Sequence, residues 1–255
     1  MDDQRAIDLS LVVPVYDCSG RMSRTIAELT RFLDAAPMRT ELVLVNDCSP
    51  RRETADLLRD VSARPDVRVL ENHRNRGKGY SVTRGILSGC GRYRVFTDAD
   101  LAYPLDEVWK IVGALERGAD VAIACRVLPD SQYMMPSSYL RYLYTRHLMS
   151  RAFNQLVRFT LLPGMLDTQA GLKGFTAAAA KAVYSRVRID GFGFDLECLF
   201  VARHLGLRVE QVPVRFRYDD EPSTVRFVRD AGTMAADLAR IRWRGWTGGY
   251  EPTVS

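Results

Sequence analysis

The sequence predicts an α/β fold in which a mostly parallel, twisted sheet is flanked by helices. Short apolar runs alternate with segments of helical periodicity through the first half of the chain, as in sheets built from successive strand–helix units. Polar residues follow four of these runs, where parallel strands present their carboxyl ends. The chain has 255 residues, of which 47% are hydrophobic, so one domain with a full core is expected.

Each element of the first half follows from a pattern of its own. Apolar runs between polar residues predict the strands, at 9–16, 41–47, 67–72, 93–100 and 119–126. The first helix carries a predicted capping box, Thr25 with Glu28. Ser49 and Pro50 predict an N-cap and a first-turn proline for the second helix. Apolar residues at helical spacing predict two further helices, at 78–88 and 105–118.

The second half of the chain changes in character. Between 131 and 166 there is no aspartate or glutamate, while leucines and tyrosines recur at helical spacing among four arginines. A helix is expected at 191–207, and Asp195 and Glu197 near its start are interpreted as structural residues or as supports for residues that contact the ligand. A strand is expected at 208–218, followed by an amphipathic helical tail within 219–255.

Composition limits the classes of function. The net charge of +5 and the pI of about 9.0 indicate an anionic partner. Five scattered cysteines without a C-x-x-C pair, and only three histidines, argue against a zinc site and favour a reducing compartment. A polar N-terminus without a signal peptide, and no apolar run of about 20 residues, predict a cytoplasmic protein or one peripheral to the inner face of a membrane. Nucleic-acid binding is not expected, because basic residues do not interleave with aromatic ones along a strand.

An acidic couplet, Asp98 and Asp100, closes the predicted strand at 93–100. On an extended backbone, residues two apart project to the same side, and two carboxylates in one cleft repel unless a cation lies between them. Oxygen ligands of this kind suit Mg²⁺ or Mn²⁺ shared with a diphosphate. The alternative is a solvated turn that carries two aspartates.

A second polar motif surrounds Lys78, which lies between Gly77 and Gly79 at a predicted helix start. Backbone N–H groups and the helix dipole favour an anion at such a position. The motif lacks the spacing and the Ser/Thr of a Walker A loop. A glycine-containing loop with a solvated lysine is the alternative.

Six segments occur in the order and spacing of one known family: VVPVYD, ELVLVNDCSP, NRGKGYSVTRG, FTDADLAYP, DTQAGLKGF and GFGFDLECL. The chain resembles family 2 glycosyltransferases, and within them the dolichyl- or polyprenyl-phosphate glucosyltransferase and mannosyltransferase branch. The resemblance implies a Rossmann-like GT-A fold at 1–218, with a nucleotide-sugar half at 9–126 and an acceptor half at 127–218, followed by the tail at 219–255. It also implies a nucleotide-sugar donor and a divalent metal, Mg²⁺ or Mn²⁺.

The resemblance assigns roles to individual residues. The implied nucleotide-sugar contacts are Pro14, Val15, Tyr16, Asp17, Asp47, Lys78, Asp98, Ala99, Asp100 and Arg126. Among them, Asp47 would read the uracil edge and Arg126 would meet phosphate, while Asp98 and Asp100 would hold the metal. The chain departs from the family pattern at Cys18, Asn46 and Ala102.

The acceptor side is implied by DTQAG and by the acid-free segment. Asp167 would be the catalytic residue, a general base for an alcohol acceptor or a positioning group for a phosphate acceptor, and Gln169 lies beside it. An isolated Asp-Thr is also typical of a turn. The arginines expected to bind an acceptor phosphate are Arg141, Arg146 and Arg151. Leucines and tyrosines around them suit a phosphate headgroup on a lipid chain.

Three functional hypotheses follow. The first is an inverting, metal-dependent transfer of a hexose to a polyprenyl or dolichyl phosphate at a membrane surface. Glucose from UDP-glucose is the expected donor sugar, and a GDP-hexose is the alternative donor. The second keeps this donor but uses a soluble small-molecule acceptor. The third is a non-catalytic nucleotide-sugar-binding protein, against which the acidic residues Asp98, Asp100 and Asp167 argue.

Overall fold

A seven-stranded mixed sheet forms the centre of the protein, in the order β3-β2-β1-β4-β7-β5-β8. The computed structural model describes residues 6–17, 20–134, 155, 157–217 and 227–251. The strands are β1 Leu9–Val15, β2 Thr40–Asn46, β3 Val67–Glu71, β4 Tyr93–Thr97, β5 Val121–Cys125, β7 Leu172–Thr176 and β8 Val209–Pro213. All neighbours run parallel except β7, which is antiparallel to both β4 and β5. The predicted mostly parallel sheet is confirmed.

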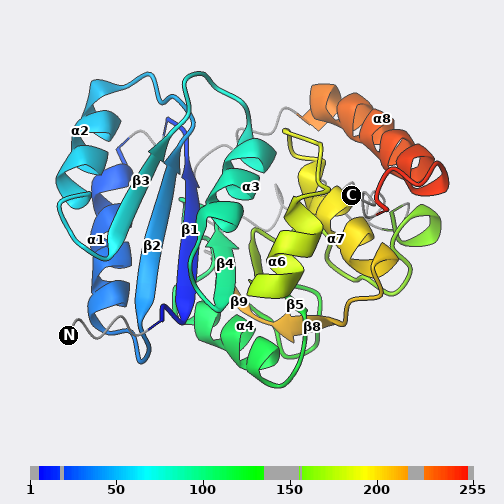
Figure 1. Cartoon of the computed structure of the whole chain (residues 1–255), viewed down its shortest axis with the longest axis horizontal. Coiled ribbons are helices and arrows are strands. Elements are labelled where there is room, and N and C mark those ends of the chain that lie inside the picture. The colour runs from blue at the N-terminus through cyan, green and yellow to red at the C-terminus, as the bar shows by residue number, and fades with distance from the viewer. Residues whose placement is uncertain (1–5, 18–19, 135–154, 156, 218–226, 252–255) are drawn as a thin grey trace.

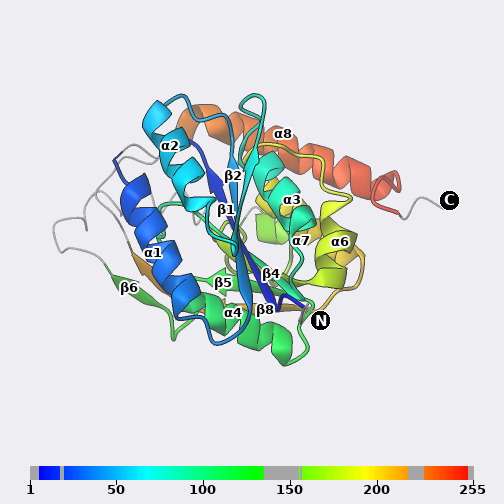
Figure 2. The same cartoon turned by 60° about the vertical axis from the view of Figure 1, so that its left-hand side comes forward.

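Helices cover both faces of this sheet (Figures 1 and 2). One face packs against α1 Met22–Asp34, α2 Arg52–Val61 and α4 Glu107–Glu116. The other packs against α3 Lys78–Ser88, α6 Ala177–Tyr184 and α7 Phe194–His204. The long C-terminal helix α8, Phe227–Trp246, lies against α7 on the outside of this second layer (Figure 1).

The central strand β1 is apolar on both faces, because each face is buried under helices. In β1, Leu11 and Val13 point into the core with α1, α2 and α4, whereas Val12 points into the core with α3, α6 and α7. Ile241 of α8 and Tyr250 beyond it are both 0% exposed in that second core. The C-terminal helix is therefore anchored to the domain by wholly buried side chains.

The two helix caps predicted in the first half are wrong, whereas the helix predicted at 78–88 is confirmed as α3. Helix α1 begins at Met22, and the buried Thr25 is not a cap, because its hydroxyl donates a hydrogen bond of 2.9 Å to the Ala99 carbonyl. Helix α2 begins at Arg52, after Ser49 and Pro50. The Ser49 N–H donates instead to the Asn46 side chain at 3.0 Å, which folds the segment after β2 into a turn.

Three further differences concern strands. The sequence predicts no strand at the position of β7. The predicted strand at 208–218 divides into β8 and β9, Arg215–Arg217, and β9 pairs with β6, Gln132–Met134, in a separate two-stranded sheet. The strand predicted at 93–100 ends at Thr97, so Asp98 and Asp100 lie in the turn that follows it.

Candidate active site

Polar residues from four parallel strands meet at one edge of the sheet, as the sequence predicts. Tyr16 follows β1, Asp47 follows β2, Asp98 follows β4, and Arg126 follows β5. The carboxyl ends of parallel strands lie at the same edge, which is where α/β proteins bind ligands. The described part of the chain thus places a polar rim above the sheet.

The acidic couplet meets a lysine at this rim. The Lys78 Nζ lies 2.6 Å from the Asp98 Oδ1. Lys78 is the first residue of α3 and lies near the rings of Phe96 and Phe194, at 6.0 and 5.8 Å from their centroids. Burial opposes the charge on Lys78, but the carboxylates of Asp98 and Asp195 raise its pKa above the ordinary value. Lys78 therefore stays positive beside the couplet.

Two close contacts fix the backbone around the couplet. Thr25 holds the Ala99 carbonyl from α1, and Ala99 itself is buried. A Cβ on Gly171 would lie 2.0 Å from the Asp98 Oδ2, so only a glycine lets this carboxylate rest against the 171 backbone. Leu101 completes the turn with a φ of 49°. The position of Asp98 is therefore determined by packing from three sides.

Asp100 is the exposed member of the couplet. Its Oδ1 accepts a hydrogen bond of 3.0 Å from the Ala102 N–H. Desolvation by the surrounding protein, and then the charge of Asp98, raise the pKa of Asp100 above its ordinary value. A further cation at this place would relieve the repulsion. Carboxylate oxygens are the ligands that Mg²⁺ and Mn²⁺ accept, so the couplet fits such an ion.

No cluster of three or more His, Cys, Asp or Glu side chains that could hold a metal exists within the described residues. The couplet would accordingly supply two carboxylates and leave the remaining positions to a ligand and to water, as is common for Mg²⁺ bound with phosphates. Such an arrangement would suit a metal bound together with a ligand rather than a closed structural metal centre.

Asp47 has a structural task in addition to the predicted contact with a base. Its carboxylate is 3% exposed and accepts hydrogen bonds from the backbone N–H of Arg76 at 2.9 Å, from that of Gly77 at 2.8 Å, and from the Asn72 amide at 2.7 Å. Gly77 has a φ of 99°, which favours glycine. Asp47 thereby holds the loop that leads into Lys78, and its recognition of a base stays a prediction.

Arg126 and Asp167 form a buried pair on the opposite side of the rim. The Asp167 carboxylate is 1% exposed and accepts from the Arg126 Nε at 2.7 Å, from its Nη2 at 2.8 Å, and from its backbone N–H at 3.0 Å. Burial opposes ionisation of Asp167, but the charge and the hydrogen bonds of Arg126 outweigh it and lower the pKa. A carboxylate of low basicity that is already bonded three times favours a positioning role over proton abstraction.

The remaining predicted contacts are spread along the rim. Tyr16 is 51% exposed, and Asp17 pairs with Arg51 at 2.7 Å. Val15 is 0% exposed, so its side chain belongs to the core, and Pro14 precedes it in β1. Gln169 is half-buried between Asp167 and Gly171. The three arginines expected to bind an acceptor phosphate lie outside the described residues: Arg141, Arg146 and Arg151.

Two features of the site escaped prediction. Lys173 of β7 is 0% exposed; its Nζ donates to the Ala170 carbonyl at 2.6 Å and pairs with Asp195 of α7. A cavity that adjoins Asp100 is lined by three arginines and one further acidic residue: Arg21, Arg24, Arg217 and Glu28. No motif marks Lys173 as buried, because a single lysine in a short strand resembles a surface residue.

An acidic couplet with a lysine, at the carboxyl edge of a sheet with one antiparallel strand, defines the class of GT-A-fold glycosyltransferases. Residues 10–182 of the chain match Glycosyl transferase family 2. The chain belongs to this family, and it is a nucleotide-sugar-dependent glycosyltransferase.

Relatives of known activity cover most of the chain. The chain is 30% identical to the dolichyl-phosphate beta-glucosyltransferase of Dictyostelium discoideum, over 93% of this chain and 75% of that protein. It is 29% identical to the human dolichyl-phosphate beta-glucosyltransferase, over 97% of this chain and 79% of that protein.

The fold is shared with glucosyl-3-phosphoglycerate synthase from Mycobacterium tuberculosis. In its complex with uridine diphosphate, that structure is 17% identical, with a TM-score of 0.68 over 93% of this chain and 81% of that one. In its complex with Mn²⁺, UDP-glucose and phosphoglyceric acid, the sequence identity is 16% and the TM-score is 0.66, and the match covers 95% of this chain and 80% of that one.

Proposed function

We propose that the protein transfers glucose from UDP-glucose to a polyprenyl or dolichyl phosphate, with inversion at the anomeric carbon and at a membrane surface. The relatives named dolichyl-phosphate beta-glucosyltransferase support the sugar and the acceptor. The structural neighbours solved with UDP and Mn²⁺ or Mg²⁺ support the donor and the metal. The observation on which the proposal depends most is the cluster of Lys78, Asp98 and Asp100 at the sheet edge.

The donor diphosphate is assigned to this cluster. A divalent ion between Asp98 and Asp100 would act as a Lewis acid that neutralises charge on the departing nucleoside diphosphate. Lys78 holds Asp98 in place and adds a fixed positive charge beside the diphosphate. Asp47 keeps the loop before Lys78 in its conformation, and the adjoining rim, with Tyr16 and Asp17, receives the base.

The transfer needs little proton chemistry when the acceptor is a phosphate. Its oxygen is already anionic at neutral pH, so it forms the new bond to the anomeric carbon while the bond from that carbon to the UDP oxygen breaks and UDP leaves with the electron pair. Asp167 is suited to this case, because it orients Arg126 rather than accepting a proton. Arg126 then faces phosphate with a guanidinium fixed by its partner.

Two surfaces of the described residues support an anionic lipid acceptor. The cavity beside Asp100 is also lined by Glu28, which pairs with Arg24 at 2.9 Å. Arg21 and Arg217 therefore place the net positive charge near the proposed donor site. On α8, Trp243 and Trp246 are 66% and 71% exposed. Exposed tryptophans beside arginines are typical of helices at an anionic lipid interface. In the described part of the chain, no helix combines the length and apolar character needed to span a bilayer.

An assay of glucosyl transfer tests the proposal. UDP-glucose and a short-chain polyprenyl phosphate are incubated with the protein in Mg²⁺ or Mn²⁺, and in a parallel reaction with EDTA. The proposal predicts a glucosyl phospholipid whose formation stops with EDTA. Metal-independent transfer would contradict the role of the couplet.

A soluble phosphorylated acceptor is the second candidate, because the structural neighbours include complexes with phosphoglyceric acid. The same assay with phosphoglyceric acid in place of the lipid distinguishes the two. Glucosyl transfer to phosphoglyceric acid but not to polyprenyl phosphate would show that the acceptor is soluble. The proposed donor site would be unaffected by that result.

A further inference from the structure

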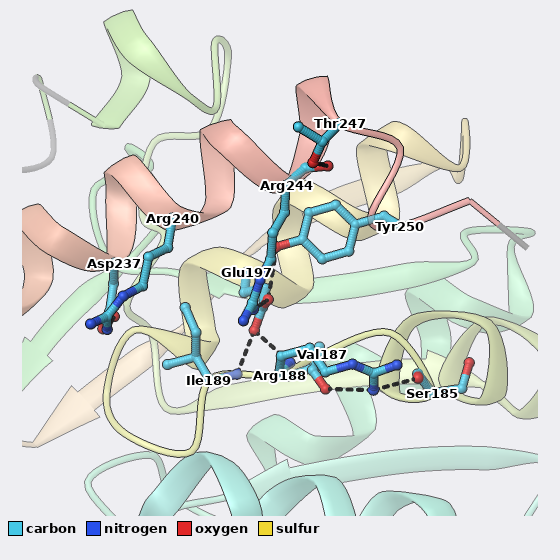
Figure 3. A network of polar contacts seen from close by, with 10 residues as sticks. All are labelled: Ser185, Val187, Arg188, Ile189, Glu197, Asp237, Arg240, Arg244, Thr247 and Tyr250. Atoms are coloured by element: carbon cyan, nitrogen blue, oxygen red, sulfur yellow. Dashed lines mark hydrogen bonds and ion pairs between the residues drawn. The ribbon is translucent and has the colours of Figure 1, made fainter.

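Glu197, in the first turn of α7, is a wholly buried carboxylate with four hydrogen-bond donors around it (Figure 3). A buried carboxylate is costly unless its oxygens are satisfied. Two donors from one part of the chain bond to one carboxylate oxygen, and two donors from another part bond to the other oxygen. This division makes Glu197 a connection between two segments rather than the partner of one.

The first oxygen holds the segment that precedes α7. The Glu197 Oε2 accepts hydrogen bonds from the backbone N–H of Arg188 at 2.8 Å and from that of Ile189 at 2.7 Å (Figure 3). Because two consecutive amides bind the same oxygen, the conformation of the backbone at 188–189 is fixed by this carboxylate.

This segment in turn supports the first turn of α3. The Asp190 carbonyl accepts a hydrogen bond of 3.2 Å from the Tyr80 N–H. The Asp190 carboxylate pairs with the Arg76 guanidinium at 3.1 Å. A Cβ on Gly79 would lie 2.5 Å from the Ile189 carbonyl oxygen, and one on Gly77 would lie 2.6 Å from the Asp190 carbonyl oxygen. The backbones of the two segments are therefore in direct contact on both sides of Lys78.

The second oxygen holds the C-terminal helix. The Glu197 Oε1 accepts from the Tyr250 hydroxyl at 2.7 Å and from the Arg244 Nη1 at 3.0 Å. Figure 3 shows Arg244 reaching down from α8 and Tyr250 approaching from beyond its end. One side chain thus joins α8 to the segment that underlies Lys78.

We propose that Glu197 is a positioning residue for the donor site, which holds Lys78 against Asp98 by way of residues 188–190 and is itself held by α8. The inference rests on the proposed function, in which Lys78 lies beside the donor diphosphate. Loss of Glu197 frees the 188–190 backbone, and α3 then loses the surface that fixes its first turn. Lys78 no longer has a single position, and donor affinity falls, whereas the acceptor side of the rim is untouched.

Glu197→Ala tests this proposal in the full-length chain. Calorimetry with UDP and Mn²⁺ should show affinity at least about tenfold lower than wild type. The KM for UDP-glucose should rise by a similar factor, while the KM for polyprenyl phosphate changes by less than about twofold. Hydrogen exchange of the amides at 76–81 should become faster, because their support is lost.

Glu41→Ala is the matched control. Glu41 is a buried glutamate near the start of β2, at the end of the strand away from Asp47. Its carboxylate accepts hydrogen bonds from the Ser10 hydroxyl and from the Cys90 N–H, both at 2.6 Å. The Glu41→Ala variant should have a lower Tm than wild type, as the Glu197→Ala variant does, but the same affinity for UDP.

Gly79→Ala approaches the same link from the other side, if Glu197→Ala fails to fold. Its Cβ pushes against the Ile189 carbonyl oxygen and leaves Glu197 intact, and it should reproduce the loss of UDP affinity. Wild-type UDP affinity and wild-type exchange at 76–81 in either folded variant would overturn the inference. A wild-type protein that binds no UDP with Mn²⁺ would instead overturn the proposed function, and the exchange measurement would still decide whether Glu197 supports α3.

Discussion

Gly171→Ala is the substitution that most sharply tests how Asp98 is positioned. The added Cβ would lie 2.0 Å from the Asp98 Oδ2, whereas ordinary contacts begin at 3.4 Å. The carboxylate must therefore retreat by about 1.4 Å, the difference between these distances. Since the Lys78 Nζ lies 2.6 Å from the other oxygen, such a shift disrupts the ion pair and moves the carboxylate that we propose holds the metal.

The expected effect is on metal-dependent donor binding more than on stability. A displacement of about 1 Å in a catalytic group costs up to about 100-fold in rate, so we expect a 10- to 100-fold rise in the Mn²⁺ concentration needed for half-maximal activity. The measurement is a Mn²⁺ titration of glucosyl transfer at fixed UDP-glucose, accompanied by calorimetry of UDP with Mn²⁺.

Gly191→Ala is the control, because a Cβ at this position meets no atom within 4 Å. It introduces the same methyl group in the loop before α7 and should leave the titration unchanged. A Gly171→Ala enzyme with wild-type Mn²⁺ dependence would show that the position of Asp98 is unimportant, and the account of the couplet would be wrong.

Three other predictions address the rest of the site. Arg126→Met removes the guanidinium from the buried Asp167 carboxylate, which keeps the backbone N–H of residue 126, and should destabilise the protein by about 3–5 kcal/mol at neutral pH. Arg126 lowers the pKa of Asp167 in the folded wild type, so the stabilisation from this pair is present above the unfolded pKa and is lost on acidification. In the variant the pKa of Asp167 in the folded state rises instead. The loss of unfolding free energy relative to wild type, measured with urea, should therefore be smaller at pH 4 than at pH 7. Arg217→Ala, beside Asp100, should raise the KM for polyprenyl phosphate about tenfold without changing UDP affinity; an equal effect of Arg59→Ala, on the exposed surface of α2, would show that only overall charge matters. Replacement of Trp243 and Trp246 by alanine should reduce co-sedimentation with anionic vesicles, and unchanged co-sedimentation would exclude this face of α8 as a lipid contact.

The nucleotide-binding half of the fold was predictable because its signals are local and repeated. Apolar runs such as β1 and β5 are buried on both faces, and each is followed by polar residues that the parallel topology collects at one edge. The couplet was found for the same reason. Its detailed geometry was not, because Asp98 lies beyond the end of β4 and its neighbours come from α3 and from the 171 backbone.

Contacts between distant segments could not be read from the sequence. Thr25 has the spacing of a capping residue, yet a tertiary hydrogen bond to Ala99 takes its hydroxyl. The antiparallel strand β7 contains a lysine and a glycine and has no clear alternation, so periodicity gave no signal. The sequence predicts a metal ion as the cation between the two carboxylates, whereas the structure also supplies the Lys78 Nζ, at 2.6 Å from the Asp98 Oδ1.

Glu197 shows why structural and functional interpretations of one residue need not compete. The sequence indicates a structural residue at a helix start, and the four hydrogen bonds confirm that role. The structure adds the direction in which this support acts, toward the first turn of α3. A residue of this kind is expected to affect donor affinity without contacting the donor.

Anomalous diffraction at the manganese edge, from crystals grown with Mn²⁺ and UDP, measures the central feature directly. We predict a single strong peak at the carboxylates of Asp98 and Asp100, with the diphosphate of UDP on its other side and the Lys78 ammonium group nearby. A manganese ion and nucleotide bound elsewhere, with the two aspartates unliganded, would contradict the account.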